Sequence, residues 1–164
     1  QMGANIVLSN ELDVGGEPVA DVRVRYAPLK GITIPEDQVP LAIDEFPAIF
    51  IAAACAEGTT ILSGAEELRV KESDRIQSMA DGLVILGIDA QPTVDGICIL
   101  GGQLGSGSVH SHDDHRIAMA FSIAALRASG EIIVLDCNNV GTSFPDFVGL
   151  AGQIGINLTS ETMS

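Results

Sequence analysis

Helical and extended patterns alternate along this chain, and one arrangement of them occurs twice. Residues 44–62 and 116–134, which begin 72 positions apart, each combine an Ala- and Ile-rich helical pattern with a Gly and a β-rich run. A second helical pattern follows each copy. In the first copy its apolar residues have the i, i+3, i+4, i+7 spacing of an amphipathic helix: Ile76, Met79, Ala80 and Leu83. The patterns predict helices at about 45–56, 72–86, 115–128 and 145–154, with Pro145 in the first turn of the last one.

Extended segments rich in β-branched residues separate these helices and predict strands. They read NIVLSNE, VADVRVRYA, TTILSG, IDAQPTV, GICILGG, EIIVLD and INLTS. With the helices they form a strand–helix–strand–helix–strand–strand unit that is present about two and a fraction times. We expect the end of one unit at about 1–30, a second unit at about 31–101 and a third at about 107–160, in a chain of the α/β class.

Glycine residues mark the expected ends of the helices. MGANIVL (2–8), LGIDAQP (86–92) and IGINLTS (154–160) each place an apolar residue and a Gly where a helix ends and an extended segment begins. Gly suits the left-handed conformation that closes a helix, and Gly58 and Gly130 are expected to close the two Ala-rich helices. The first of the three segments lacks its helix, so we expect the chain to begin inside a structural unit and to be a fragment.

Composition narrows the class of protein. The 164 residues are enough for one compact domain with a core, and 46% of them are hydrophobic but only 4% aromatic. A formal net charge of −14 argues against a nucleic-acid surface, and the apolar run IFIAAACA (49–56) is too short to span a membrane. The first residues carry no basic segment, so we expect no signal peptide. We therefore expect a cytoplasmic protein.

Three cysteines, Cys55, Cys98 and Cys137, bear on the redox compartment. Their number is odd, each lies in an apolar context, and their spacing is not that of metal ligands. We interpret them as buried free thiols in a reducing compartment rather than as a disulfide framework.

The stretch LRVKESDRI (68–76) gathers three of the chain's eight basic residues at the expected start of a helix. Lys71 and Arg75 are expected to share one face of its first turn, with Glu72 beside them, and Arg116 stands at the start of the third helix. A helix N-terminus is the positive end of its dipole. Cations there therefore need an anion to offset the repulsion, or they turn into solvent.

Spacing alone leaves two interpretations of these charges open. In one, Asp44 and Asp114 are N-caps, the charges of LRVKESDRI form a solvated salt-bridge cluster, and His115 is a surface imidazole. In the other, the cations bind carboxylate or phosphate beside a carboxylate that can move protons. HSHDDH (110–115) has the composition of a metal site but no partner cluster elsewhere, so neither a metal nor a cofactor is expected. GGQLGSGS (101–108) lacks the Lys-Ser/Thr ending of a phosphate loop and is interpreted as a turn.

Longer motifs sharpen the expectation. IDEFPAIFIAAACAEGTT, LRVKESDRI, DDHRIAMAFSIAAL and TSFPDF (142–147), in this order, resemble the EPSP synthase (3-phosphoshikimate 1-carboxyvinyltransferase) family over essentially the whole chain. The resemblance implies two lobes, each an inside-out α/β barrel of three βαβαββ units about a pseudo-threefold axis, with helices buried inside outward-facing sheets. Since the family chain is longer, this sequence resembles most of the C-terminal lobe.

The resemblance also implies a reaction and roles for single residues. The enolpyruvyl group of phosphoenolpyruvate is transferred to the 5-hydroxyl of shikimate 3-phosphate with release of phosphate, and the missing N-terminal lobe is the partner. Asp44 matches the carboxylate that accepts the hydroxyl proton, Lys71 the lysine that bridges both substrates, and Glu72 the acid that protonates the methylene carbon. Arg75 and Arg116 match the two arginines that hold phosphoenolpyruvate.

His115 is expected to contact substrate as well, and two positions depart from some family members. Glu67 stands in place of an asparagine, and Thr142 in place of a lysine. A non-catalytic repeat domain with anion-binding helix ends and another enolpyruvyl transferase stay open as alternatives. The carboxylates of Asp44 and Glu72 argue against the first, since anion binding alone needs only cations, and the RVKESDR string argues against the second. No nucleic acid and no membrane is expected as a partner.

Overall fold

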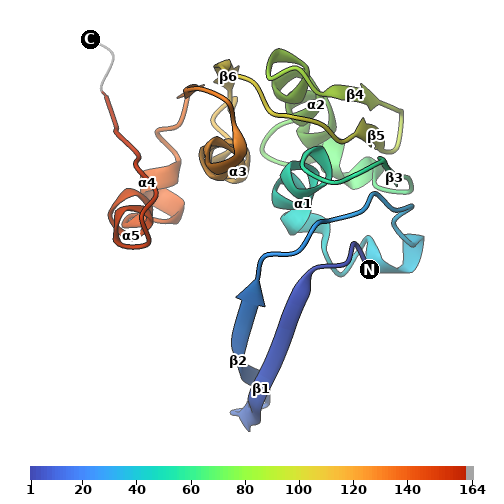
Figure 1. Ribbon diagram of the computed structural model, residues 1–164, viewed down its shortest axis with the longest axis vertical. Helices are drawn as coiled ribbons and strands as arrows, with labels where there is room; N and C mark the ends of the chain where they lie inside the picture. The colour runs from blue at the N-terminus through green and yellow to red at the C-terminus, as the bar shows by residue number, and fades with distance from the viewer. Residues whose placement is uncertain (162–164) are drawn as a thin grey trace.

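The structure, a computed structural model, describes residues 1–161. Its body consists of helices with sheets outside them, and a long hairpin projects from this body (Figure 1). The hairpin pairs β1 (Asn5–Val14) with β2 (Glu17–Arg25) in antiparallel register. Gly15 and Gly16, which connect the two strands, both have left-handed φ angles that glycine adopts without strain. Side chains along both strands are exposed almost throughout.

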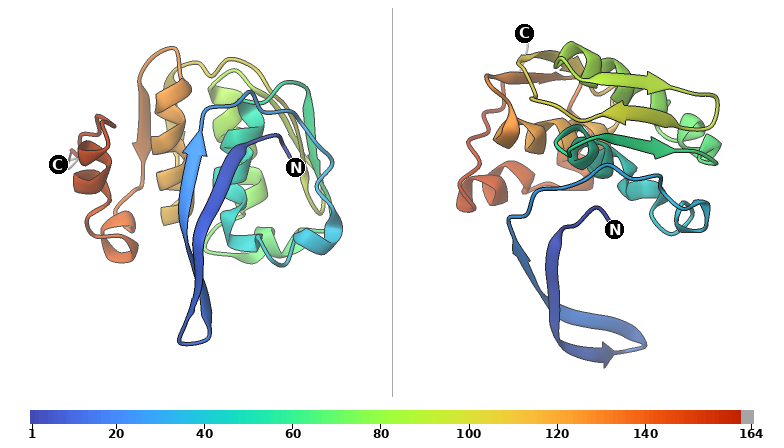
Figure 2. Two further views of the ribbon diagram at one scale, coloured as in Figure 1. Left: turned by 60° about the horizontal axis from the view of Figure 1, so that its bottom comes forward. Right: turned by 45° about the vertical axis from the view of Figure 1, so that its right-hand side comes forward.

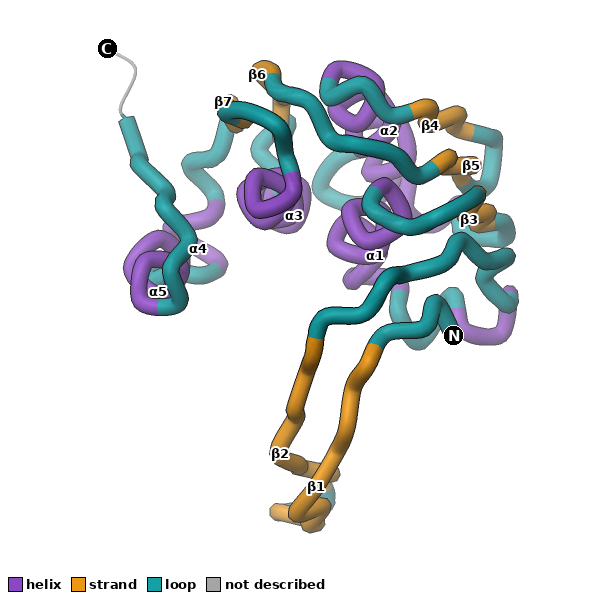
Figure 3. Tube along the Cα trace, in the orientation of Figure 1, coloured by secondary structure: helices purple, strands orange, loops and turns teal. Residues whose placement is uncertain are grey.

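Three helices form the interior of the body and two sheets lie on their outer side (Figure 3). The helices are α1 (Phe46–Ala54), α2 (Arg75–Ile85) and α3 (His115–Ala124). One sheet has the antiparallel order β3-β5-β4, built from β3 (Thr59–Leu62), β4 (Asp89–Pro92) and β5 (Ile97–Leu100). The other pairs β6 (Gly107–His110) with β7 (Ile132–Leu135) in parallel. Helix α1 packs on β5, α2 on β4 and β6, and α3 on β7.

Each sheet turns one face to the helices and the other to solvent, as Figure 2 shows. In β3, Thr60 and Leu62 are buried while Thr59 and Ile61 are exposed, which is the alternation of a half-buried strand. In β5 the buried positions are again every second residue. The expected α/β fold with inner helices and outer sheets is therefore confirmed.

The order of elements along the chain follows the predicted unit. Residues 29–34 run parallel to β3, with bridges from Lys30 to Glu57 and from Thr33 to Ile61. This segment is followed by α1, β3, α2, β4 and β5, and β6, α3 and β7 then repeat the first half of that order. The division into units at 1–30, 31–101 and 107–160 stays a prediction.

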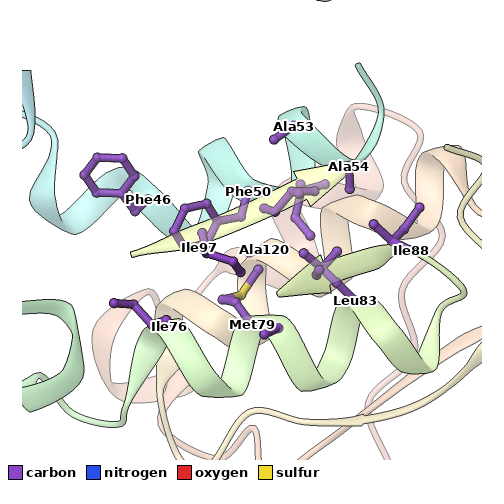
Figure 4. Close-up of a cluster of buried hydrophobic side chains, with 14 of the residues drawn as sticks. Phe46, Phe50, Ala53, Ala54, Ile76, Met79, Leu83, Ile88, Ile97 and Ala120 are labelled. Carbon is purple, nitrogen blue, oxygen red and sulfur yellow. The ribbon is translucent and has the colours of Figure 1, made fainter. Parts of the chain in front are cut away.

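The core lies where the three helices meet (Figure 4). Large side chains from all three are at most 1% exposed there: Phe46 and Phe50 from α1, Met79 and Leu83 from α2, and Phe121 from α3. Helix α2 contacts α3 at Gly82, where an added Cβ would lie 2.3 Å from the ring of Phe121. The missing side chain of Gly82 is what makes room for that ring.

Shorter helical segments connect these elements. Turns of 3₁₀ helix occur at Glu36–Gln38, Ile43–Glu45, Glu66–Val70 and Ala125–Arg127, and two short helices, α4 (Val140–Ser143) and α5 (Phe147–Gln153), follow β7.

Helix α2 begins three residues after its predicted start at about residue 72, within the two to four residues allowed for a boundary. The helix begins at Arg75, because the side chain of Asp74 accepts a hydrogen bond from the backbone N–H of Gln77 and acts as the N-cap. Lys71 and Glu72 therefore precede the helix and do not share its first turn with Arg75. Pro145 likewise lies in the turn before α5 rather than in its first turn.

Two strand assignments also differ. The turn predicted at 101–108 overlaps residues 107–110, which form β6 because they pair with β7. The predicted strand INLTS (156–160) is not a strand in the structure. Gly3, Gly87, Gly155 and Gly58 have the left-handed φ expected of them. Gly130 does not, since the preceding helix has already ended in the 3₁₀ turn and the extended residue Ala128.

No helix within residues 1–161 is long and apolar enough to cross a membrane. All three cysteines are free, as predicted. Cys55 and Cys98 are half-buried, whereas Cys137 is exposed because it lies in the surface connection after β7, so its expected burial was wrong.

Candidate active site

The N-termini of α1, α2 and α3 meet at one cluster of charged side chains. Arg75 is the first residue of α2, Asp114 is the N-cap of α3, and Asp44 lies in the 3₁₀ turn that leads into α1. These residues are 31 and 39 positions apart along the chain, yet Arg75 contacts both carboxylates directly. The cluster therefore forms only when the three helices have packed together.

Arg75 is the centre of the cluster. Its side chain is 1% exposed, and each nitrogen of the guanidinium donates to a different carboxylate. Nε donates to Asp114 at 2.8 Å, Nη1 to Asp44 at 2.9 Å, and Nη2 to Glu72 at 2.6 Å. Burial alone would lower the pKa of Arg75, but its hydrogen bonds to these carboxylates and their negative charges, Asp114 first, raise it. A cation so placed stays charged.

Asp114 is fully buried, and its carboxylate accepts hydrogen bonds from residues of two helices, α2 and α3. Oδ1 accepts the backbone N–H groups of Arg116 at 2.9 Å and Ile117 at 3.4 Å, which is an N-cap. Oδ2 accepts from Arg75 and, at 3.1 Å, from the hydroxyl of Ser73. Burial raises the pKa of Asp114, yet the hydrogen bond and charge of Arg75 outweigh it, so the pKa lies below its ordinary value.

The sequence predicted Asp114 only as a possible cap and missed its pairing with Arg75. The Asp before a helix pattern is a local signal for capping. Arg75 lies 39 positions away, so no local pattern could indicate the ion pair.

Lys71 approaches the same cluster from the loop before α2. Its ammonium nitrogen lies 3.7 Å from Asp44 and 2.5 Å from Glu67. The hydrogen bond to Glu67 is the main reason why the pKa of Lys71 is raised. Burial raises the pKa of Asp44, but Arg75, Lys71 and Arg116 together lower it below the ordinary value, so Asp44 is ionised near neutral pH.

Asp44 does not act as the N-cap of α1, which was one of the two open interpretations. The cap position belongs to Glu45, whose side chain makes no capping bond. The carboxylate of Asp44 is directed instead to Arg75 and Lys71. The carboxylate of Asp44 therefore forms ion pairs and does not cap a helix.

Arg116 and His115 begin α3 at the edge of the cluster. Nη1 of Arg116 donates to the backbone carbonyl of Asp44 at 2.9 Å and to the carboxylate of Glu45 at 3.1 Å, across more than seventy residues. His115 is half-buried, and its ring makes no hydrogen bond in the described part of the chain. The structure thus joins Asp44, Lys71, Glu72, Arg75 and Arg116 in one contact network, while His115 lies next to it in sequence but outside its bonds.

A pocket of about 480 Å³ opens beside the cluster, between α1 and α3. Asp44, Glu45 and Arg116 line it together with apolar side chains such as Ile51 and Ile123. Within residues 1–161, no group of His, Cys, Asp and Glu side chains is arranged to hold a metal ion. The chemistry available at the cluster is that of paired carboxylates and fixed cations.

Comparison with known proteins agrees with the geometry. A family model described as EPSP synthase (3-phosphoshikimate 1-carboxyvinyltransferase) matches residues 1–150. The chain is 65% identical over 158 residues to the 3-phosphoshikimate 1-carboxyvinyltransferase of Methylococcus capsulatus, which covers 96% of the chain and 36% of the relative. It is 67% identical to the same enzyme of Nitrosococcus oceani, over 95% of the chain and 35% of the relative. The chain thus spans about a third of the length of these curated relatives.

Solved structures give the same picture. EPSP synthase from Acinetobacter baumannii superimposes with a TM-score of 0.94 at 57% identity, over 98% of this chain and 38% of that one. The enolpyruvyl transferase NikO from Streptomyces tendae shares the fold, with a TM-score of 0.64 at 19% identity over 99% of this chain and 35% of that one. With a family model over most of the chain, close relatives and a matching fold, the chain belongs to the EPSP synthase (3-phosphoshikimate 1-carboxyvinyltransferase) family.

Proposed function

We propose that this chain supplies part of the active site of a 3-phosphoshikimate 1-carboxyvinyltransferase. In this proposal the complete enzyme transfers the enolpyruvyl group of phosphoenolpyruvate to the 5-hydroxyl of shikimate 3-phosphate and releases phosphate. The observation that carries the proposal is the single contact network in which Asp44, Lys71, Glu72, Arg75 and Arg116 meet at three helix N-termini. Helix N-termini and fixed cations favour the binding of anionic groups.

Asp44 is the proposed base. Its pKa is lowered because Arg75, Lys71 and Arg116 outweigh the effect of burial, so near neutral pH it is an ionised carboxylate with a vacant site for a proton. When the 5-hydroxyl of shikimate 3-phosphate attacks the central carbon of phosphoenolpyruvate, its proton passes to Asp44. Lys71, at 3.7 Å from Asp44, would bridge the two substrates as they react.

Glu72 is the proposed acid for the methylene carbon. In the structure its carboxylate accepts a hydrogen bond from Nη2 of Arg75 at 2.6 Å. An acid must carry a proton at the moment of reaction. We therefore infer that phosphoenolpyruvate takes over Arg75 and releases Glu72, which takes up a proton from solvent and donates it to the methylene carbon, giving a tetrahedral intermediate.

Arg75 and Arg116 are the proposed holders of phosphoenolpyruvate, with His115 beside them. Arg75 is fixed through Nε by Asp114, so a bound anion would meet a preorganised guanidinium. Collapse of the intermediate breaks the C–O bond to phosphate while the Glu72 carboxylate takes back a proton from the former methylene carbon, so phosphate leaves and the double bond is restored. Fixed positive charge near the departing phosphate stabilises the charge that develops there.

The second lobe of the enzyme is the proposed partner of this chain. Orienting two substrates against groups from both sides of a cleft can supply roughly 7–11 kcal/mol of the barrier. This chain spans 36% of the length of the Methylococcus relative and 35% of the Nitrosococcus relative. The remaining part of such an enzyme would complete the cleft.

The experiment completes the chain with the remaining two thirds of the Methylococcus relative and measures phosphate release from both substrates. We expect turnover, with Asp44→Asn and Glu72→Gln each lowering kcat by about 10²–10⁴-fold, the usual contribution of acid–base groups. Asp81→Asn, an exposed carboxylate later in α2, serves as the matched control and should retain full activity. Anion binding without turnover in the completed protein would contradict the proposal and favour a non-catalytic anion-binding domain.

A further inference from the structure

Carboxylates outnumber cations in the cluster where anions are proposed to bind. The cluster contains three cations: Lys71, Arg75 and Arg116. They form ion pairs with five carboxylates: Asp44, Glu45, Glu67, Glu72 and Asp114. If all are ionised, the network has an excess of negative charge, which repels a phosphate or carboxylate group. Some of these carboxylates must leave their cations when an anion binds.

Burial separates the fixed carboxylates from the movable ones. Asp114 is 0% exposed and receives four hydrogen-bond donors, so it stays in place. The side chain of Glu67 is 61% exposed, and in residues 1–161 its carboxylate has Lys71 as its single polar partner. Glu67 therefore loses little besides that ion pair when it turns away.

The backbone around Glu67 allows this change without other movement. Leu68, the next residue in the same 3₁₀ turn, is fully buried, and its N–H donates to the carbonyl of Ala65 at 3.0 Å. The turn is thus anchored in the core while the carboxylate of Glu67 projects outward. Lys71 would still lie near Asp44 once Glu67 has rotated away.

We propose that Glu67 is a displaceable counterion of Lys71, which holds the ammonium group at the site until a phosphate or carboxylate group takes its place. This inference rests on the proposed function, because that function assigns Lys71 to anion binding. Glu67 is then a positioning residue that acts through Lys71 and lowers the affinity of the site for anions. A neutral amide at position 67 should leave Lys71 free and tighten anion binding.

The test measures the Kd of inorganic phosphate for the full 164-residue chain by calorimetry at low ionic strength. We expect Glu67→Gln to lower the Kd by about two- to fivefold, the range that exposed ion pairs usually support. The difference should shrink as salt is added. Glu66→Gln is the matched control, since it removes the same charge from the same 3₁₀ turn at an exposed residue that makes no ion pair in residues 1–161. It should leave the Kd nearly unchanged.

A second background isolates the pair. In chains that carry Lys71→Met, Glu67→Gln should no longer lower the Kd for phosphate. The reason is that Lys71→Met has already removed the ion pair on which that effect depends. Equal Kd values for Glu67→Gln and Glu66→Gln, a gain that persists without Lys71, or no phosphate binding by Glu67→Gln would each overturn the inference. Turnover by the completed enzyme is scored separately. Its absence would contradict the proposed function, whereas an unchanged Kd ratio would contradict only the role of Glu67.

Discussion

At the scale of single residues, Asp114 joins two helices through one carboxylate. It caps α3 and neutralises Arg75, whose side chain is almost completely buried. Replacing one partner of a buried ion pair leaves the other charge uncompensated. Asp114→Asn is therefore expected to lower the free energy of unfolding by about 3–5 kcal/mol, measured by urea denaturation followed by circular dichroism. The neighbouring exposed Asp113→Asn is the control, and equal stability of the two variants would show that the buried pair contributes nothing net.

The same carboxylate makes stability depend on pH. The pKa of Asp114 is lowered in the folded chain, because the hydrogen bond and charge of Arg75 outweigh burial, while the unfolded chain keeps a value near 3.8. A lowered folded pKa contributes stability that is fully present above the unfolded value and is lost as pH falls through the folded one. Urea midpoints should thus fall as the pH drops below about 4. They should fall less steeply in Asp114→Asn, and parallel curves would contradict this assignment.

Several site residues could be predicted from local sequence, but the bonds between them could not. Charged residues at expected helix starts led to Asp44, Lys71, Glu72, Arg75 and Arg116, and the family motifs suggested a role for each. The pairing of cations with carboxylates depends on which helix ends meet in space. Partners that lie tens of residues apart leave no periodic signal, so the ion pairs of the cluster had to come from the structure.

At the scale of elements, Gly82 sets how closely α2 and α3 can pack. A Cβ at this position would lie 2.3 Å from the ring of Phe121, which is itself fully buried. Gly82→Ala should destabilise the chain by about 1–3 kcal/mol through overpacking, although alanine favours helix. Gly152→Ala in α5 is the matched control, since nothing lies within 4 Å of its added Cβ, and it should be neutral or stabilising by up to about 1 kcal/mol. Thermal unfolding of both variants measures the difference, and equal shifts would mean that the ring moves aside at no cost.

The elements themselves were predictable where the pattern was long. The Ala-rich helices and the strands beside them follow from period and β-branched content, and α1 and α3 lie within a few residues of their expected positions. Helix α2 begins three residues later than about residue 72 because Asp74, inside the charged stretch, is its cap. Strand β6 was missed because its identity comes from pairing with β7, about 25 residues later, and not from its own Gly- and Ser-rich sequence.

At the scale of the whole molecule, the sequence predicted inner helices and outer sheets through its internal repeat and its family resemblance. The repeat indicates that one unit must stack on another to bury its helices. It does not indicate which parts of the surface stay open. The hairpin of β1 and β2 exposes apolar side chains along its length, and the pocket between α1 and α3 has mostly apolar walls. The hydrophobic pattern along the chain does not encode which of these apolar surfaces stay exposed.

The proposed division of labour predicts that the 164-residue chain alone binds anions but catalyses nothing. The cluster has cations at helix N-termini, yet an open half-cleft leaves the substrates in water, where charge contacts are weakened by screening. Mixed with both substrates, the chain should release no phosphate, while phosphoenolpyruvate should bind weakly at low salt. Arg116→Ala should weaken that binding, because Arg116 contributes a charge at the cluster through its contact with Asp44. Arg23→Ala, which removes the same charge from the exposed hairpin, should not. Identical titrations for the two variants would exclude Arg116 from the anion site, and product formed by the chain alone would show that no second lobe is needed.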